Sequence, residues 1–474
     1  MYHYPRHSAS PLRWHQILLL LAACTCGVLI LDFISDPGVR IATLCTTAVL
    51  TFAACRPANR DIFHPDWVII ASTLVYMVLK PILMYRDSDL VFQGYTVRDT
   101  LALVVILATI AALGFFTGTS IRYRPKSSAT QQYEATLFIK LGLALSVIGA
   151  VCYIAYGVVA GFGLYDRVGI LGSINAKGSS VGYLFEAQTL ATPASCMLIA
   201  GLRRRRLNVT SVCMILLLLV LGIASGFRAR MVMAIAPAAI VWYLRKRSRP
   251  KLATGIVLIT GAMLSLAILT VARSRTDAPA HGMDQNVLDP SVLLGDTNIV
   301  PAFARIVKEV PDSTPYLKGS SFTYIPFHVL PRAWFPDKGV SPEIELVWRL
   351  TGRQNGFAYP FLGMLYVNFG AIGVFLGFLL LGWIANRIYT NWRRQPKDPF
   401  AQAYLAIFVV FLFVMWPRPH VAASCADAVF LFAPLALARW IATLRGRSRY
   451  KGVNIGRLPT SRASDPQAAW PTYA

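Results

Sequence analysis

The stretch DTLALVVILATIAALGFFTGTS, residues 99–120, decides what class of protein this is. No side chain between Asp99 and Arg122 is charged, and none of these residues is proline. A helix of about 20 apolar residues crosses the roughly 30 Å hydrocarbon core of a bilayer, and it satisfies every backbone polar group internally. The stretch therefore predicts a transmembrane helix.

Similar apolar runs fill most of the chain. Hydrophobic residues make up 55% of the 474 residues and charged residues only 14%. A soluble protein needs about 25% charged residues, so this composition excludes a water-soluble enzyme. We predict an all-α polytopic integral membrane protein with about twelve transmembrane helices and one long periplasmic loop. The predicted helices are 16–34, 39–55, 66–84, 99–120, 136–160, 183–202, 208–224, 229–244, 252–271, 359–382, 400–416 and 421–440.

The formal net charge of +24 comes from short basic clusters between the apolar runs. Such clusters do not form the continuous basic face of a nucleic-acid-binding protein, so no nucleic acid partner is expected. Cytoplasmic loops retain Lys and Arg, and every second loop is basic, which predicts that both termini are cytoplasmic. The basic positions are Arg6, Arg13, Arg56, Arg60, Arg122, Arg124, Lys126, 203–206, 245–251, Arg387, Arg393, Arg394, Lys397, Arg445, Arg447, Arg449 and Lys451.

Five segments follow from this pattern. Residues 1–15 form a cytoplasmic N-terminus, and 16–271 carry helices one to nine. The segment 272–358 contains nine Lys/Arg and nine Asp/Glu, and its prolines and glycines predict a periplasmic loop of short helices and turns. Residues 359–444 carry helices ten to twelve, and 445–474 form a basic, disordered cytoplasmic tail.

Four arginines mark the periplasmic ends of adjoining helices. Arg228 and Arg230 lie between the seventh and eighth predicted helices, and Arg273 and Arg275 follow the ninth. Cations there oppose the positive-inside rule and are costly unless they meet an anion or a water-filled cavity. A guanidinium group binds phosphate through two parallel hydrogen bonds, which favours a phosphate-binding pocket. The alternative is that these side chains reach lipid head groups.

A second candidate site is FTYIPFHVLPRAWFPDKG, residues 322–339. Its prolines and aromatics predict a semi-rigid hairpin at the membrane surface that presents His328, Arg332 and Lys338. His420 ends a short predicted turn at the same face. The alternative is interfacial anchoring by the aromatic side chains. The eight cysteines form no CxxC pair and no nucleotide-binding motif is present, so no metal or other cofactor is expected.

Three stretches resemble the Wzy-type polymerases of O-antigen and exopolysaccharide repeat units. The resemblance extends to the topology over about residues 15–440, and O-antigen ligases are similar in topology. Within the third stretch, Gly373 and Gly377 form a GxxxG pair that favours helix packing. The stretches are Arg228 after Ser225-Gly226, the segment from Pro331-Arg332 to Asp337-Lys338, and YPFLGMLYVNFGAIGVFLGFLLLG at 359–382.

The chain departs from the family pattern at two positions. Gly339 follows Lys338 where the family often has proline, and Met364 stands where a glutamate often precedes the Tyr-x-Asn-Phe-Gly stretch. The resemblance therefore implies no acidic catalytic residue at position 364. Arg167 and Gly178 have the Arg-x10-Gly spacing of some members, which makes Arg167 a further candidate for substrate binding.

The resemblance implies an enzyme of the bacterial inner membrane that joins repeat units carried on undecaprenyl pyrophosphate. Arg228 and Arg332 would stabilise the leaving pyrophosphate, and His328 would accept a proton from the acceptor hydroxyl. Expected partners are membrane lipids, a chain-length regulator and a flippase. An O-antigen ligase and a flippase or other transporter of the same glycan stay open as alternatives. The candidates for substrate binding are Arg230, Arg273, Arg275, Lys338, Arg167 and His420.

Overall fold

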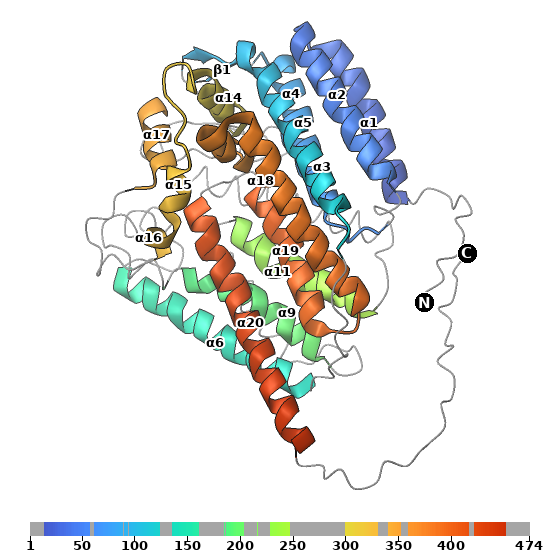
Figure 1. Ribbon diagram of the computed structural model, residues 1–474, viewed down its shortest axis with the longest axis vertical. Helices are drawn as coiled ribbons and strands as arrows, with labels where there is room; N and C mark the ends of the chain where they lie inside the picture. Colours follow the sequence, from blue (N-terminus) through green and yellow to red (C-terminus); the bar gives the residue numbers. More distant parts are fainter. Residues whose placement is uncertain are drawn as a thin grey trace.

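The computed structural model describes residues 14–56, 61–88, 90–92, 94–123, 135–160, 184, 186–202, 216, 228–246, 299–329, 340–351, 359–416 and 421–451. These residues are almost entirely helical (Figure 1), which confirms the predicted all-α class. Their only strands, β1 (Val91–Phe92) and β2 (Tyr95–Thr96), pair antiparallel as a short hairpin.

The described chain begins with a helical hairpin of α1 (Trp14–Phe33) and α2 (Pro37–Cys55). Asp36 caps α2, because its carboxylate accepts the backbone N–H of Val39 at 3.0 Å. Pro37 occupies the first helical position, where no N–H is needed. The Arg40 guanidinium donates to the Ile34 carbonyl oxygen at 2.9 and 2.6 Å, which closes the turn.

The third and fourth predicted helices lie where the sequence places them. The run at 66–84 is divided into α3 (Asp66–Thr73), the π-helix η2 (Leu74–Leu79) and α4 (Lys80–Arg86). The stretch at 99–120 forms α5 (Arg98–Ser120), and α6 (Ala135–Ala160) follows. Each of these spans agrees with its predicted position to within two residues.

The predicted run at 183–202 is not one continuous helix. A 3₁₀ turn, η3 (Ala187–Leu190), precedes α9 (Ala191–Gly201). Pro193 explains the change, because proline has no N–H to donate to the carbonyl of Thr189 and its ring crowds that carbonyl. α11 (Arg228–Lys246) covers the run at 229–244. The runs at 208–224 and 252–271 lie outside the described residues, apart from Leu216.

The long segment 272–358 contains short helices where it is described. They are α14 (Ile299–Glu309), α15 (Ser320–Thr323), α16 (Ile325–Val329) and α17 (Pro342–Thr351). The first part of the predicted hairpin is therefore helical, and residues 330–339 lie outside the described residues.

Three helices complete the described chain: α18 (Phe361–Arg394), α19 (Pro399–Met415) and α20 (Val421–Lys451). α18 runs beyond its predicted end at 382, so Arg387, Arg393 and Arg394 lie on a helix. Hydropathy marks where the apolar surface stops, and the helix continues because no proline follows until Pro396. α20 continues into residues 445–451 of the predicted disordered tail, where basic side chains favour a helix C-terminus.

Seven helices of the described chain are long and apolar enough to cross a membrane. α19, with 17 residues, is apolar but shorter. The protein is therefore a multi-pass membrane protein, and the total of twelve spans stays a prediction.

The helices pack around two main hydrophobic cores. The first core joins α1 to α5 with α14 and α18, and the second joins α6, α9 and α11 with α20. α19 belongs to both, because Phe408 and Leu412 enter the first core while Phe400 and Ile407 enter the second. In Figure 1 the two groups of helices lie on either side of α18 and α19.

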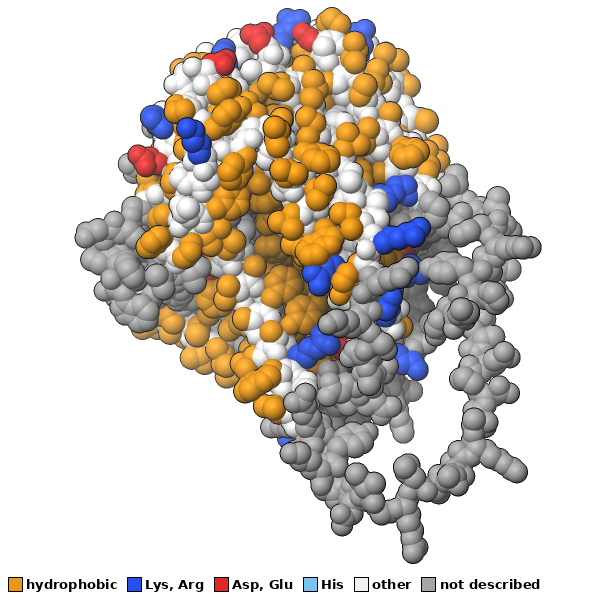
Figure 2. Space-filling model, viewed as in Figure 1, with side chains coloured by type: hydrophobic (Ala, Val, Ile, Leu, Met, Phe, Trp, Pro, Cys, Tyr) orange, Lys and Arg blue, Asp and Glu red, His pale blue; other side chains and the backbone are white. Residues whose placement is uncertain are grey.

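The two ends of the first group of helices carry different charges. We call the end with β1 and α14, where α18 begins, the loop end, and the end where α5 and α18 finish the opposite end. At the opposite end Arg56 donates to Ser120 Oγ at 2.6 Å, and Arg387 lies 4.7 Å from the Tyr123 ring. Figure 2 shows Lys and Arg side chains toward the opposite end and hydrophobic side chains over the middle. Both signs of charge are present at the loop end.

Candidate active site at the loop end

α18 is broken near its start. Gly370 has φ 66° and ψ −160°, a conformation essentially reserved for glycine. After this residue the chain turns back, so that Leu365 and Phe369 lie against Gly373, and Leu365 also lies against Gly377. The predicted packing role of Gly373 and Gly377 is thus fulfilled within α18 itself and not against a neighbouring helix. In membrane transporters such discontinuous helices often line substrate sites.

Asn368 joins the broken helix to the long segment. Its Oδ1 accepts the Gly319 N–H at 3.1 Å, and its Nδ2 donates to Ser321 Oγ at 3.1 Å and to the Met364 carbonyl at 2.9 Å. The Leu317 N–H also donates to the Val367 carbonyl at 2.8 Å. These bonds supply partners for backbone groups that the break leaves free, so the Tyr-x-Asn-Phe-Gly stretch acts as a structural joint.

A buried polar cluster lies beside this joint. We define the Glu343 cluster as Ser321, Ser341, Glu343 and Tyr359, from α15, α17 and the segments that precede α17 and α18. The Glu343 side chain is 0% exposed, and the other three are buried as well. Among the residues that the structure describes, no group lies in hydrogen-bonding geometry with either Glu343 carboxylate oxygen, and the Ser341 and Tyr359 hydroxyls have no partner there either. Buried carboxylates of this kind are rare in folded proteins.

The surroundings of Glu343 favour its neutral form. Burial raises the pKa of the Glu343 carboxyl, and the facing Ser321 and Ser341 hydroxyls oppose that shift only in part. Burial and the neighbouring Glu343 also raise the pKa of Tyr359 well above its usual value. A protonated Glu343 and the three hydroxyls can each donate and accept hydrogen bonds.

Arg305 is a buried cation of the same end. Its Nη2 lies 3.2 Å from Glu309 Oε1, and its guanidinium carbon lies 2.9 Å from the centre of the Tyr95 ring. Its Nε and Nη1 atoms have no hydrogen-bond partner in the part of the chain that the structure describes. Glu309 and Tyr95 together place this arginine between α14 and the β-hairpin.

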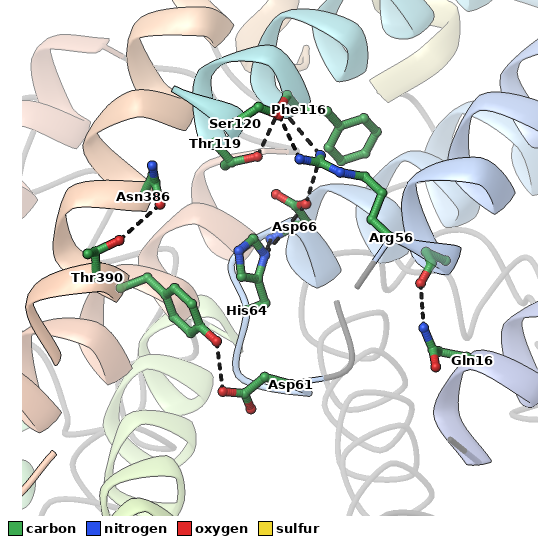
Figure 3. Close-up of polar contacts among 12 residues, drawn as sticks. Gln16, Arg56, Asp61, His64, Asp66, Phe116, Thr119, Ser120, Asn386 and Thr390 are labelled. Atoms are coloured by element: carbon green, nitrogen blue, oxygen red, sulfur yellow. Dashed lines mark hydrogen bonds and ion pairs between the residues drawn. The ribbon is translucent and has the colours of Figure 1, made fainter. Parts of the chain in front are cut away.

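A second polar network lies at the opposite end and is shown in Figure 3. Arg56 points toward Asp66 and the end of α5, donating to Asp66 Oδ2 and to the Phe116 carbonyl at 3.4 Å each. Tyr389 of α18 donates to Asp61 Oδ2 at 2.8 Å. The network ties α2, α3, α5 and α18 together.

His64 is the buried centre of this opposite-end network. Burial lowers the pKa of His64, although Asp66 and Asp61 act in the opposite direction. A neutral imidazole explains why Nδ1 accepts the Asp66 N–H at 3.3 Å, and the ring also packs edge-on against Tyr389. Arg56, His64 and Tyr389 each bond to an aspartate of the network, so we interpret it as structural. Its buried Asp66 Oδ1 has no hydrogen-bond partner among the described residues.

The structure places only part of the residues predicted for the site. Arg228 and Arg230 are in the first turn of α11 and His328 is in α16, but their side chains lie outside the description. Six further predicted residues lie outside the described residues altogether: Arg332, Arg273, Arg275, Lys338, Arg167 and His420.

The helix directions show which of these backbones approach one another. Leu244, near the end of α11, packs with Tyr389 at the opposite end, so α11 begins toward the loop end. α16 packs against α20, and Figure 1 shows it beside the end at which α20 begins. The Arg228 and His328 backbones therefore lie toward the same end as the break in α18.

These elements fall within one family match. A family model described as O-antigen polysaccharide polymerase Wzy matches residues 68–438. The chain belongs to this family. Wzy proteins polymerise O-antigen polysaccharide, so the chain is a membrane-embedded polymerase of O-antigen biosynthesis, as the resemblance implied. Comparison with curated proteins and with solved structures gave no match.

Sequence reasoning missed Glu343 and Arg305. The segment 272–358 has equal numbers of acidic and basic residues, which predicts solvent-exposed charges. Neither Glu343 nor Arg305 stands out in such a pattern. The sequence feature that could have drawn attention to Glu343 is Pro342, because a proline often starts a helix and Glu343 then lies in its first turn.

Proposed function

We propose that the chain is a glycosyltransferase that joins undecaprenyl-pyrophosphate-linked repeat units at the periplasmic face of the bacterial inner membrane. The donor is the growing glycan, and the acceptor is one repeat unit on the same carrier. An acceptor hydroxyl oxygen bonds to the anomeric carbon, the bond from that carbon to the pyrophosphate oxygen breaks, and undecaprenyl pyrophosphate leaves. The hydroxyl proton passes to a base of the protein.

The proposed roles follow the charge that develops in this reaction. Arg228 and Arg332 stabilise the leaving pyrophosphate, and His328 accepts the proton. One contact that strengthens in the transition state is commonly worth about 3 kcal/mol, or roughly a hundredfold in rate. Substrate binding is assigned to Arg230, Arg273, Arg275, Lys338, Arg167 and His420.

The match to the Wzy family carries the proposal, because residues 68–438 include every residue of this proposed site. The position of the Arg228 and His328 backbones, on the side of the bundle where α18 is broken, supports it. Discontinuous helices often line substrate sites in membrane transporters, which further supports a site at this end.

The charges of the two ends support the proposed orientation. Cations at the opposite end include Arg56, Arg122, Arg387 and Arg393. The loop end mixes both signs, as in the pair Arg86–Asp87. By the positive-inside rule, these charges support a cytoplasmic position for the opposite end.

A cysteine at Ser313 is expected to react with an impermeant thiol reagent in intact spheroplasts. Ser313 is exposed and follows α14 at the loop end. A cysteine at Lys246, exposed at the end of α11, is the matched control and should react only after lysis. The background must lack the native cysteines, since Cys24, Cys45 and Cys55 are exposed. The reverse labelling pattern would place the loop end in the cytoplasm and contradict the proposed face.

Arg228→Ala should abolish long-chain product in a deletion strain while the protein inserts normally. The Arg228 guanidinium would no longer hold the pyrophosphate. Arg228→Lys should restore only part of the product, because an ammonium cannot form the two parallel hydrogen bonds of a guanidinium group. Product length is measured on a glycan gel. Lys246→Ala removes a cation from the same helix at the opposite end and should leave full-length polymer.

The deletion strain also separates the alternatives. A lost polymerase leaves single capped repeat units, a lost ligase leaves free polymer, and a lost flippase leaves neither outside. Full-length polymer in the Arg228→Ala strain would mean that Arg228 only anchors the protein to head groups.

A further inference from the structure

The Glu343 cluster combines burial with a surplus of hydrogen-bonding groups. Four buried atoms have no hydrogen-bond partner among the described residues: Glu343 Oε1 and Oε2, Ser341 Oγ and Tyr359 Oη. Ser321 and Glu343 belong to helices that pack together, α15 and α17, and Tyr359 lies near enough to Glu343 for this carboxyl to raise its pKa. Such groups are costly to bury unless something bonds to them.

The chemistry of these groups suits a sugar hydroxyl. A hydroxyl donates one hydrogen bond and accepts up to two, and a neutral carboxyl, a serine and a tyrosine can each donate or accept. A pyrophosphate is a poor fit, because none of the four residues of the cluster carries a positive charge. The part of the substrate that fits is thus a sugar remote from the pyrophosphate.

The cluster lies close to exposed aromatic surface. Ser321 is followed by half-buried Phe322, which packs at 5.7 Å from the ring of Phe369. Phe369 is 48% exposed, and Ile344, next to Glu343, is half-buried. Apolar side chains therefore lie beside the polar groups, a combination that binding sites for organic ligands also use.

We propose that the Glu343 cluster is a subsite that binds a hydroxyl of the acceptor sugar, with Glu343 as one of its hydrogen-bonding groups. The proposal rests on the proposed polymerase function and adds to it the place where the acceptor sugar is held. In the reaction, the sugar that carries the attacking hydroxyl is the one farthest from its own pyrophosphate. The joint at Asn368 connects the subsite to the broken helix, since Asn368 bonds to Ser321.

The test uses the purified full chain and two probes from the deletion strain. One probe is the lipid-linked repeat unit that this strain accumulates, and the other is the oligosaccharide released from it, which lacks the pyrophosphate. Glu343→Ala should weaken binding of the released oligosaccharide at least about tenfold, the loss expected for one well-placed buried hydrogen-bonding group. Glu343→Gln stays neutral and should bind within about threefold of the wild type.

Two further variants keep the test decisive. Tyr359→Phe removes one hydroxyl and should weaken binding by a smaller factor, and Glu345→Ala, exposed on the same helix, should change nothing. In the polymerisation assay Glu343→Ala should raise KM for the lipid-linked unit more than it lowers kcat. If Glu343→Ala does not fold, as judged by gel filtration, Tyr359→Phe decides: weaker binding supports the subsite and unchanged binding overturns it.

Other outcomes overturn the subsite. If Glu343→Gln binds the oligosaccharide normally but loses turnover as fully as Glu343→Ala, Glu343 acts as an ionised base. Wild-type binding in both folded Glu343 variants would make the cluster structural. A wild-type chain that binds the oligosaccharide but forms no polymer would refute the proposed function and leave the sugar subsite standing.

Discussion

Gly370→Ala should sharply reduce the amount of folded protein and leave no long-chain polymer. The φ of 66° and ψ of −160° at this position belong to a region that residues with a Cβ scarcely enter, at a cost of about 1–3 kcal/mol. The new Cβ would also stand 3.2 Å from the Tyr316 hydroxyl oxygen. Relief of this strain would straighten α18 and pull Asn368 away from Gly319 and Ser321. Yield on gel filtration and the glycan ladder measure the two effects.

Gly157→Ala is the matched control for Gly370→Ala. Gly157 lies in α6, and a Cβ there meets no atom within 4 Å. Alanine should keep or slightly raise the yield there, since it favours helix over glycine. Normal yield and normal polymer from Gly370→Ala would show that α18 runs straight through residue 370.

Gly118→Ala should separate α5 from α18 and destabilise the first core. A Cβ at Gly118 would overlap the Leu379 carbonyl oxygen and come within 2.8 Å of the Trp383 nitrogen. Both are backbone atoms of α18, which cannot move aside as a flexible side chain can. Overpacking of a well-packed site commonly costs about 1–3 kcal/mol. Thermal unfolding of the purified chain should show the loss.

Gly27→Ala is the control for Gly118→Ala, because a Cβ on that face of α1 meets nothing within 4 Å. Gly382 makes the reciprocal contact, with its Cβ position overlapping the Phe115 carbonyl oxygen. Once one alanine has forced the helices apart, the second should cost less, so the double variant Gly118→Ala with Gly382→Ala should be less destabilised than the sum. An unchanged unfolding midpoint in Gly118→Ala would mean that the helices do not approach this closely.

We assign different roles to the two polar regions of the first core: a structural role at the opposite end and substrate binding at the loop end. At the opposite end, Arg56, His64 and Tyr389 bond to Asp66 or Asp61 and hold the helices in place. In the described part of the chain, four buried atoms of the Glu343 cluster have no hydrogen-bond partner, whereas Asp66 Oδ1 is the one such atom among Arg56, Asp66, His64 and Tyr389. Arg56 and Asp66 also precede the matched range 68–438, whereas the Glu343 cluster lies inside it.

The candidate site could be predicted only in part. Arg228 and Arg230 stand out in the sequence because they oppose the positive-inside rule. Their role in the site remains a prediction. Glu343 does not stand out, because its burial depends on Ser321, Tyr359 and the packing of α17. Neither charge counting nor hydropathy reports whether a carboxylate in a mixed segment faces water or the interior.

The sequence by itself determined the class of protein, the place of most helices and the family. A bilayer requires about 20 apolar residues with every backbone group bonded locally, so each span can be recognised from its own residues. The Asp36–Pro37 cap is local in the same way. Only the tertiary structure decided the break at Gly370, the partners of Gly118, and the burial of Glu343. These depend on atoms brought together from distant parts of the chain, such as Asn368 and Gly319, and no local pattern contains that information.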